Sequence, residues 1–498
     1  MKTLLIAVAA VMAGVASAAD VSVVKSVADE VCAITSCGTL TNGVAFVDFV
    51  LRPEAESDIR CRIELPPPEK WSGEFWGTGN ASLGGSMPKV SDLPVSLGAA
   101  NVTTDMGTSR YVYGDRKDKP IPKAVLRDFY WRSTHLMTVY GKRIAKAFYG
   151  RWPAHSFFRG CSRGGHQGMS EALRYPEDYD GVISSTPAGI LAPSSAQFVN
   201  LYGQTHDAAG KPLVTREQLR IVADAPIEYM RDREPRPYAG KVLSNPFLEE
   251  KDVDGFLALA AKKDPALGEP DIMRRLKNVF KGVSHGGKVL CHGMTPGAFM
   301  GFEHGRSYEN RGSLLVEMYY RQRGDNTLAT WDEFEEEVRR ANGYSSACST
   351  DLRAFRARGG KLIVLCGWED QTTPSPEMVA WYEMLAERFG GYGETQGFCR
   401  LFPLPGHAHG GGKGRISTGL GYDLEHLNQL RRWVEEGVAP ETFPHHWKEE
   451  GLTFPIPPYP FMCYQDESGA WRTRRYPEGM VRRPDPSYYA CDSKPEIR

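Results

Sequence analysis

Apolar and polar residues alternate in short runs near the start of the chain. Over residues 44–65 the alternation predicts a β-hairpin or meander, and residues 74–76 are a further strand candidate. Residues 127–149 instead repeat apolar positions at helical spacing, with few helix breakers, until Gly150 ends the run. This part of the chain therefore predicts strands followed by a long helix.

The next segments predict a parallel sheet. Residues 155–159 are a short apolar strand candidate, and a glycine-rich turn over residues 160–165 follows at once. A helix-compatible run over residues 166–175 leads to another buried-strand candidate at residues 181–185. Strand, tight turn, helix and strand in this order are typical of an α/β fold.

This rhythm is interrupted after about Ala188. A long stretch follows that is helical and loop-rich and dense in aromatic residues, before strand patterns return at residues 361–366 and 399–404. We therefore expect one α/β core interrupted by an inserted lid domain. The expected organisation is a leader at 1–18, the core at 19–189 and 349–440, the lid at 190–348, and an irregular tail packed on the core at 441–498.

The N-terminus has the three parts of a secretory signal peptide. Lys2 precedes an apolar stretch over residues 4–16, and Ala-Ser-Ala at 16–18 fits the rule of small residues before a cleavage site, so that the mature chain starts near Ala19. The stretch is too short to span a bilayer, which needs about 20 residues. No other stretch is apolar enough to cross a membrane. The expected location is extracellular or periplasmic, with no membrane partner.

Composition adds further constraints. The 60 basic and 61 acidic residues nearly cancel, which gives no sign of a nucleic-acid partner. Ten cysteines in an exported chain make disulfides the default, although the sequence leaves their pairing open. The chain has no Cys-x-x-Cys pair and no His/Cys cluster at ligand spacing, so no metal and no cofactor are expected. The sequence makes no prediction of the oligomeric state.

The best candidate for chemistry lies in the turn after residues 155–159. Residues 160–164 read Gly-Cys-Ser-Arg-Gly, the G-x-S-x-G pattern in which a serine sits on a sharp turn between a strand and a helix. The glycines are needed because bulky neighbours would not fit there. The N-terminus of the following helix would stabilise a developing oxyanion. Ser162 is therefore the predicted nucleophile, and the alternative is a glycine-rich turn with an incidental serine.

A serine nucleophile needs a base and an orienting acid later in the chain. Asp370 follows the strand candidate at 361–366, and His409 follows the one at 399–404. Sheets of parallel strands place their sites at the carboxyl ends of the strands. We therefore expect Asp370 to orient His409, and His409 to act as the base.

Each of these residues has a rival. Glu369 is adjacent to Asp370, and His407 precedes His409 by two residues. For Asp370 and for Glu369, the alternative to a role in catalysis is a carboxylate that faces solvent in a loop. His409 is preferred because the glycine-rich stretch after it lets the backbone approach the serine. Asp180 comes too early in chain order, and a structural role in a turn is expected for it.

Two backbone N–H groups should form an oxyanion hole. One belongs to Arg163, the residue after the nucleophile, and the other should come from a loop after an early strand. The loop at residues 77–85 is the candidate, with Ala81 as the donor. Each donor would lower the transition-state free energy by about 3 kcal/mol. The alternative for this loop is an ordinary turn.

Several long stretches carry a family resemblance. They are WSGEFWGTGN, TTDMG, FYWRSTHLMTVYGKRIAKAFYG, GCSRGGHQGMSEALRYPEDYDGVISSTPAG, TDLRAFRARGGKLIVLCGWEDQTTP and PLPGHAHGGG, from about Trp71 to Gly412. The chain resembles the tannase and feruloyl esterase family of α/β-hydrolases, which includes a hydrolase of mono(2-hydroxyethyl) terephthalate. The resemblance implies an α/β-hydrolase fold: a mostly parallel central sheet flanked by helices, with a large lid domain inserted between the later strands. It also places Ser162, Asp370 and His409 at the triad positions.

The chain departs from the family pattern at a cysteine. The resemblance implies a disulfide between cysteines next to the serine and the histidine, but Gly410 follows His409 and only Cys161 is present. Cys161 is then a free buried thiol or pairs elsewhere, with Cys366 or Cys399 as candidates whose Cα atoms would have to lie within about 7 Å.

The resulting hypothesis is a secreted serine esterase that cleaves esters of aromatic acids, of feruloyl or galloyl type, through an acyl-enzyme. Its substrate would be a small aromatic ester or a polyphenol or cell-wall fragment. Lid residues that could stack on an aryl acid are Phe198, Tyr202, Tyr229, Phe247, Phe299, Phe302, Tyr308, Tyr319, Tyr320 and Trp331. The alternatives are a carbohydrate acetyl esterase or peptidase on the same triad, and a binding protein that has lost catalysis.

We predict that the protein holds no structural calcium. Family lids often bind calcium in an Asp/Gly-rich loop, but residues 252–255 (Asp-Val-Asp-Gly) are the nearest match and offer too few of the roughly six to eight oxygen ligands that calcium takes. Elemental analysis of the purified protein should find no stoichiometric calcium, and one calcium per chain would contradict the prediction.

Overall fold

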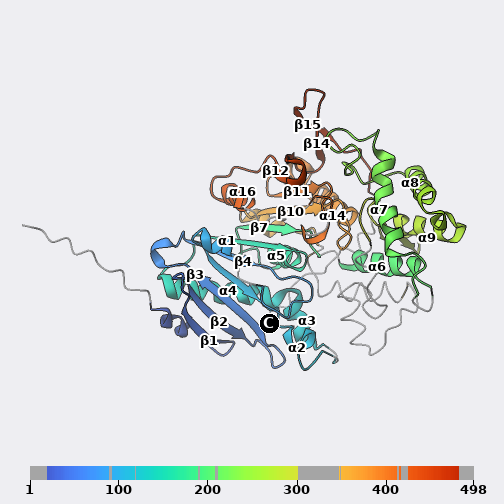
Figure 1. Cartoon of the computed structure of the whole chain (residues 1–498). Helices are drawn as coiled ribbons and strands as arrows, with labels where there is room; N and C mark the ends of the chain where they lie inside the picture. The colour runs from blue at the N-terminus through green and yellow to red at the C-terminus, as the bar shows by residue number, and fades with distance from the viewer. Residues whose placement is uncertain are drawn as a thin grey trace, which may run out of the picture.

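A nine-stranded sheet forms the centre of the molecule (Figure 1). The computed structural model describes residues 20–88, 92–117, 119, 121–188, 191–207, 211–300, 332, 347, 349–411, 414–416 and 424–481. The strands lie in the order β1-β2-β3-β5-β4-β6-β7-β10-β11. Their bounds are β1 (Cys32–Thr39), β2 (Ala45–Leu51), β3 (Ile59–Leu65), β4 (Glu74–Thr78), β5 (Ala100–Thr104), β6 (His155–Cys161), β7 (Gly181–Ser185), β10 (Lys361–Gly367) and β11 (Cys399–Leu404).

The sheet is antiparallel at one edge and parallel elsewhere. The pairs from β1 to β5 are antiparallel, and every pair from β5 through β4, β6, β7 and β10 to β11 is parallel. All residues of β4, β5 and β7 are buried, as are six of the seven of β10. Parallel strands buried on both faces read as short apolar runs, and the sequence predicted β4, β7 and β10 in this way. It did not predict β5. The structure confirms the mostly parallel α/β sheet.

Helices surround this sheet and extend beyond it. Their bounds are α1 (Asp92–Ser96), α2 (Ser109–Val112), α3 (Lys123–Arg127), α4 (Ser133–Tyr149), α5 (Arg163–Arg174), α6 (Leu191–Thr205), α7 (Arg216–Met230), α8 (Glu250–Lys263), α9 (Pro270–Lys281), α13 (Arg353–Ala357), α14 (Ser375–Arg388), α15 (Tyr392–Gln396) and α16 (Leu424–Glu435). The helix predicted at 127–149 forms as α3, a π-helical turn and α4. Gly150 ends it with a φ of 76°, the left-handed conformation that glycine adopts without steric cost.

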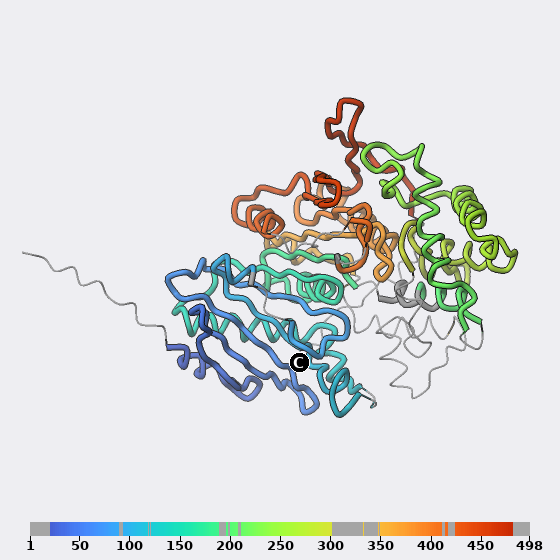
Figure 2. The backbone as a smooth tube through the Cα atoms, viewed as in Figure 1, coloured from blue at the N-terminus to red at the C-terminus, as the bar shows by residue number. Residues whose placement is uncertain are grey.

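The helices between β7 and β10 in the chain have an apolar core of their own. Side chains such as Leu219, Val222, Phe256 and Leu276 are buried together there. After α9, the same segment forms a short two-stranded sheet, in which β8 (Val283–His285) pairs with β9 (Lys288–Cys291). Figure 2 shows the segment, green to yellow, lying together to one side of the central sheet. The inserted helices therefore form a body beside the sheet rather than a layer of it.

The segment expected to be an irregular tail contains regular structure. β12 (Phe443–Trp447) pairs with β13 (Leu452–Ile456), and β14 (Phe461–Gln465) pairs with β15 (Trp471–Arg475), both antiparallel. The expectation was wrong for these residues. Pro444 and Pro455 face each other in the first hairpin, and proline argues against a strand when the sequence is read alone.

The cysteine predictions are corrected in part. Cys161 and Cys366 are both free thiols, so the pairing of Cys161 with Cys366, or with Cys399, was wrong. Cys32, Cys37, Cys61, Cys399 and Cys463 also carry free thiols. Cys348 and Cys491 lie outside the described residues, as does the leader at 1–18. Among the described helices, none combines the length and the apolar character that crossing a membrane requires.

Candidate functional site

Ser162 lies on the sharp turn between β6 and α5. Its φ of 59° and ψ of −115° are unusual for a residue with a side chain, and such a conformation costs about 1–3 kcal/mol. Its N–H donates to the carbonyl of Ser185 (2.9 Å), and its own carbonyl accepts from the N–H groups of His166 (3.0 Å) and Ala188 (2.9 Å). These bonds hold the strand-to-helix turn that the G-x-S-x-G pattern predicts. The role of Ser162 as nucleophile stays a prediction.

Three glycines let the backbone segments around this turn approach each other. A Cβ on Gly160 would lie 2.3 Å from the carbonyl carbon of Gly164, and one on Gly79 would lie 2.4 Å from the Cα of Gly164. Both distances fall well inside van der Waals contact. The glycines of the motif are therefore required by backbone-to-backbone packing, and the loop after β4 is part of that packing.

His409 and Asp370 form a hydrogen-bonded pair. His409 Nδ1 lies 2.9 Å and 3.1 Å from the two carboxylate oxygens of Asp370, which is fully buried. The carboxylate also accepts from the N–H groups of Thr372 (2.8 Å) and Thr373 (2.7 Å) and from the Thr373 hydroxyl (2.6 Å). A proton on Nδ1 that donates to Asp370 leaves Nε2 as an acceptor, the state a general base needs. The sequence did not identify Thr373 as a partner.

The residues next to Ser162 and His409 contact each other. Cys161 Sγ lies 3.2 Å from the Thr186 hydroxyl, and the Gly410 amide is close enough to counteract part of the burial effect on the pKa of its thiol. Thr373 Oγ1 donates to the Thr186 carbonyl at 3.4 Å, so the turns after β6, β7, β10 and β11 meet at one place. Burial raises the pKa of the Cys161 thiol to about 11. It therefore stays protonated at neutral pH and is no rival nucleophile.

The rival residues lie in different surroundings. His407 is fully buried, and neither ring nitrogen has a hydrogen-bond partner among the described residues. Burial holds the pKa of its ring well below the usual range. Glu369 faces Arg415, with Oε1 3.3 Å from the guanidinium Nε. Asp180 accepts from the Ser156 N–H and pairs with Arg358 at the opposite end of the strands. Of these acids and bases, only Asp370 and His409 pair with each other.

The two predicted oxyanion donors lie near the turn. The N–H of Arg163 is the first amide of α5 and has no acceptor within the helix. Ala81 N–H donates to the Asn80 side chain (2.7 Å), while Asn80 N–H donates to Gln167 of α5 (2.7 Å). The loop after β4 is thus bonded to the helix that follows Ser162. The use of Ala81 as a donor stays a prediction.

A cavity of about 320 Å³ adjoins the loop that bears His409. The core contributes Glu369, Gln371, Ala408, Gly414 and Arg415 to its walls, and the inserted segment contributes Arg216, Arg220, Gly297 and Phe299. Gln371 Oε1 also accepts from the His409 N–H (3.3 Å), which places the cavity against the candidate base. Among the aromatic residues that the sequence offered as possible contacts of an aryl acid, Phe299 lines this cavity. The members of that set from Phe302 to Trp331 lie outside the described residues.

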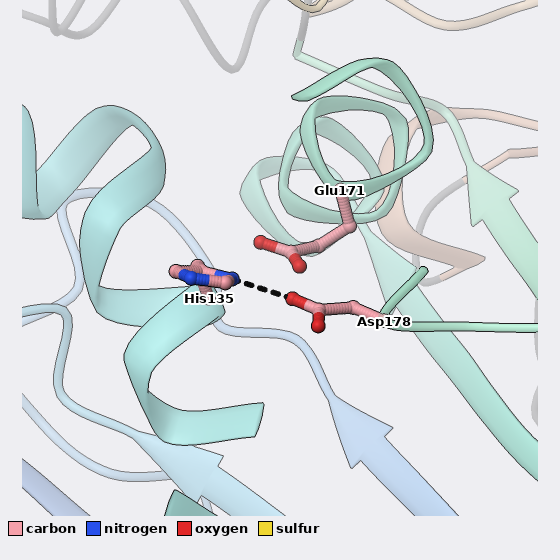
Figure 3. Close-up of side chains that lie close together, drawn as sticks. All are labelled: His135, Glu171 and Asp178. Atoms are coloured by element: carbon pink, nitrogen blue, oxygen red, sulfur yellow. Dashed lines mark hydrogen bonds and ion pairs between the residues drawn. The ribbon is translucent and has the colours of Figure 1, made fainter. Parts of the chain in front are cut away.

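A second polar cluster lies at the other end of α5. In Figure 3 the side chains of His135, Glu171 and Asp178 point toward one another, and His135 Nδ1 lies 2.6 Å from an Asp178 oxygen. Among the described residues this is the group whose atoms could hold a metal ion, since they lie within 4.8 Å of one another. The buried ammonium of Lys142, which donates to the Asp178 carbonyl, supplies positive charge there instead. The Asp252 and Asp254 carboxylates of the weak calcium candidate lie on α8 and pair with Arg233 and Lys277.

Comparisons with known proteins agree with this arrangement. A sequence profile described as "Tannase and feruloyl esterase" matches residues 47–229 and 318–473. The chain is 28% identical over 428 residues to "Probable feruloyl esterase B-1" of Aspergillus oryzae, covering 81% of this chain and 77% of that one. It is 27% identical over 443 residues to an uncharacterized esterase of Xanthomonas campestris, covering 79% and 75%.

Two solved structures share the fold. Feruloyl esterase B from Aspergillus oryzae superposes with a TM-score of 0.73 and 22% identity, covering 90% of this chain and 97% of its own. Tannin acyl hydrolase from Aspergillus niger superposes with a TM-score of 0.72 and 16% identity, covering 93% and 96%. At these identities the likeness establishes the fold.

Replacing Gly160 by alanine should disable the turn at Ser162. Because the new Cβ would overlap the Gly164 backbone, we expect a lower thermal midpoint and a rate of fluorophosphonate labelling of Ser162 reduced by about a hundredfold or more. Gly203→Ala is the matched control, since a Cβ there meets no atom within 4 Å. Wild-type labelling and stability in Gly160→Ala would contradict the packing argument.

Glu369 should make stability depend on pH. Burial raises the pKa of its carboxyl from 4.5 to about 7, so its contribution to the free energy of unfolding is fully present below about pH 4.5 and is lost as the pH rises through about 7. Between about pH 4.5 and about pH 7, the free energy of unfolding of wild type should fall by about 3 kcal/mol more than that of Glu369→Gln. Urea unfolding at several pH values measures this difference, with the exposed Glu435→Gln as control. A difference between wild type and Glu369→Gln that does not change with pH would refute the prediction.

Proposed function

Because the chain belongs to the tannase and feruloyl esterase family, we propose that it is a serine esterase that cleaves esters of aromatic acids. The relatives named feruloyl esterase and the fold shared with a tannin acyl hydrolase support this substrate class. The single observation that carries the proposal is the hydrogen-bonded His409–Asp370 pair. Thr373 and Thr186 link this pair to Cys161, the residue before the strained Ser162.

The proposed reaction proceeds in two steps. Ser162 Oγ attacks the ester carbonyl carbon while His409 Nε2 takes the hydroxyl proton, and the resulting tetrahedral oxyanion is bound by backbone N–H groups. The C–O bond to the alcohol then breaks, and His409 returns the proton to the departing alkoxide. Water, deprotonated by His409, attacks the acyl-enzyme in the second step and releases the acid and the Ser162 hydroxyl.

The surroundings of the pair fit this chemistry. Asp370 fixes the imidazole tautomer, and its bonds to the Thr372 and Thr373 amides leave its carboxylate one orientation. The partial positive charge at the N-terminus of α5 favours negative charge beside the Arg163 amide. Ala81 is the proposed second donor, which requires its N–H to turn from the Asn80 side chain toward the substrate.

The remaining parts of the proposal concern the insertion and the location of the enzyme. We propose that residues 190–348 act as a lid over the core at 19–189 and 349–440, because Arg216, Arg220 and Phe299 reach the cavity beside His409. The leader at 1–18 would direct the enzyme out of the cytoplasm. Its substrate would then be a small aromatic ester or a polyphenol or cell-wall fragment.

Hydrolysis of methyl gallate, methyl ferulate and monomethyl terephthalate tests the proposal. Wild type should cleave at least one of them, and Ser162→Ala should lower kcat by about a thousandfold or more, because the nucleophile is removed. Asp370→Asn should also lower kcat strongly, because the imidazole tautomer is no longer fixed.

The matched control is Ser170→Ala, the same substitution in the helix that follows Ser162. Within the described part of the chain the buried Ser170 hydroxyl has no hydrogen-bond partner, so this variant should keep wild-type activity. Activity on small acetyl esters alone would favour an acetyl esterase. Failure of a fluorophosphonate probe to label Ser162, together with no hydrolysis, would favour a binding protein that has lost catalysis.

A further inference from the structure

The segment after β7 holds the backbone of Ser162. The Ser185 carbonyl accepts a hydrogen bond from the Ser162 N–H (2.9 Å), and the Ala188 N–H donates one to the Ser162 carbonyl (2.9 Å). Thr186 lies between these residues, and its hydroxyl oxygen is 3.2 Å from the Sγ of Cys161. The segment therefore fixes the backbone that carries the proposed nucleophile.

Thr186 is itself held in an unfavourable conformation. Its φ of 36° lies in the left-handed region, which a β-branched residue rarely adopts. The residue is buried, and its N–H donates to the Leu365 carbonyl of β10 (2.8 Å). Backbone strain of this kind persists only where surrounding contacts fix the residue. The position of the Thr186 carbonyl is therefore set by the fold and not by local preference.

The Thr186 carbonyl faces the hydroxyl of Thr373. The two oxygens are 3.4 Å apart, and the same hydroxyl donates to Asp370 Oδ2 at 2.6 Å. A hydroxyl has one proton. The proton points mainly at Asp370, because the contact is shorter and the acceptor is a carboxylate. Thr373 thus lies between the segment that holds Ser162 and the carboxylate that holds His409.

The hydroxyl binds the carboxylate oxygen that is nearer to the candidate base. Asp370 Oδ1 accepts from the backbone amides of Thr372 (2.8 Å) and Thr373 (2.7 Å). Asp370 Oδ2 accepts from the Thr373 hydroxyl and lies 2.9 Å from His409 Nδ1, against 3.1 Å for Oδ1. Asp370 and Thr373 are both buried, and burial strengthens a hydrogen bond to a carboxylate. Without the hydroxyl, Oδ2 would lose the donor that fixes it opposite Nδ1.

We propose that Thr373 is a positioning residue of the triad. Its hydroxyl fixes Asp370 Oδ2 opposite His409 and holds this pair at a set position relative to the turn that bears Ser162. The proposal rests on the proposed esterase function and adds a fourth side chain to it. Thr373 acts through Asp370 and His409 rather than on the reacting atoms, and Thr186 is the fixed point on the Ser162 side.

The variant Thr373→Val tests the role of the hydroxyl. It keeps the β-branched shape and the backbone N–H that binds Asp370. On whichever of methyl gallate, methyl ferulate and monomethyl terephthalate wild type cleaves, kcat should fall about tenfold or more, because a hydrogen bond to a charged group is lost. KM should change less than about threefold, because the substrate's own contacts are kept.

The conservative variant Thr373→Ser separates positioning from packing. It restores the hydroxyl and should recover kcat to within about threefold of wild type. A Thr373→Ser variant as impaired as Thr373→Val would assign the loss to packing and overturn the proposal. Wild-type kcat in Thr373→Val would overturn it as well.

Thr395→Val is the matched control. Thr395 is buried in α15, before the start of β11, and its hydroxyl donates to the Gly391 carbonyl (2.9 Å). The same substitution there removes a buried hydroxyl at the opposite end of the strand from His409, and kcat should be unchanged. A fall in kcat equal to that of Thr373→Val would assign the effect to the loss of any buried hydroxyl and overturn the proposal.

A double-mutant cycle tests the link to the Ser162 side. Thr186→Val keeps the β-branched shape at the strained φ and removes the hydroxyl that lies beside Cys161. If Thr186 and Thr373 act as one unit, kcat of the double variant should fall by less than the product of the two single effects. A fall equal to that product would overturn the link.

Fluorophosphonate labelling separates this proposal from the failure of the proposed substrate class. The rate of labelling reports the reactivity of Ser162 and needs no ester. If wild type is labelled but cleaves none of the esters, labelling should still slow about tenfold or more in Thr373→Val. Equal labelling rates would overturn the role of Thr373 while the serine hydrolase stands.

Crystal structures cover the case in which wild type is not labelled at all, which would be a failure of the proposed function. The Asp370 carboxylate should then still be turned away from His409 Nδ1 in Thr373→Val and should face it in Thr373→Ser. An unchanged Asp370–His409 geometry in Thr373→Val would overturn the positioning role.

Discussion

The close approach of three backbone segments at the end of β6 is the constraint on which the rest of the site depends. Gly160, Gly164 and Gly79 come so close that none can carry a Cβ without displacing its neighbour. This contact joins the turn of Ser162, the first turn of α5 and the loop after β4 into one rigid unit. It holds Ser162 at a φ that an isolated chain would avoid, and it places the helix N-terminus beside the serine.

The parallel register of the sheet brings the other groups to the same edge. Asp370 follows β10 and His409 follows β11, and β7 lies between β6 and β10. Thr186, after β7, bridges the two halves through Cys161 and Thr373. In this chain the Cys161 thiol lies near the Gly410 amide, where the family resemblance implies a disulfide. The contact between the two loops is kept without a covalent bond.

The sequence predicted those parts of the structure that depend on local pattern. Strands β6, β7, β10 and β11 are apolar because they are buried on both faces, and the serine, aspartate and histidine follow them in a fixed chain order. The hairpin of β12 and β13 was missed because prolines lie within it. Gln167, Thr373 and Arg415 carry no local signal, since their importance comes only from what the fold places beside them. The cavity beside His409 was unpredictable for the same reason.

The asparagines that surround the site have a practical consequence for producing the protein. Asn80 and Asn101 each begin an Asn-x-Ser/Thr sequence, the acceptor for N-linked sugar in a eukaryotic secretory pathway. Both are buried: Asn80 donates to the carbonyls of Ser86 and Thr104, and Asn101 accepts from the Thr78 hydroxyl inside the sheet. A glycan attached before folding would keep β4 and β5 from closing on each other. A host that glycosylates exported chains would therefore yield misfolded enzyme, whereas a bacterial host leaves both asparagines free to enter the core.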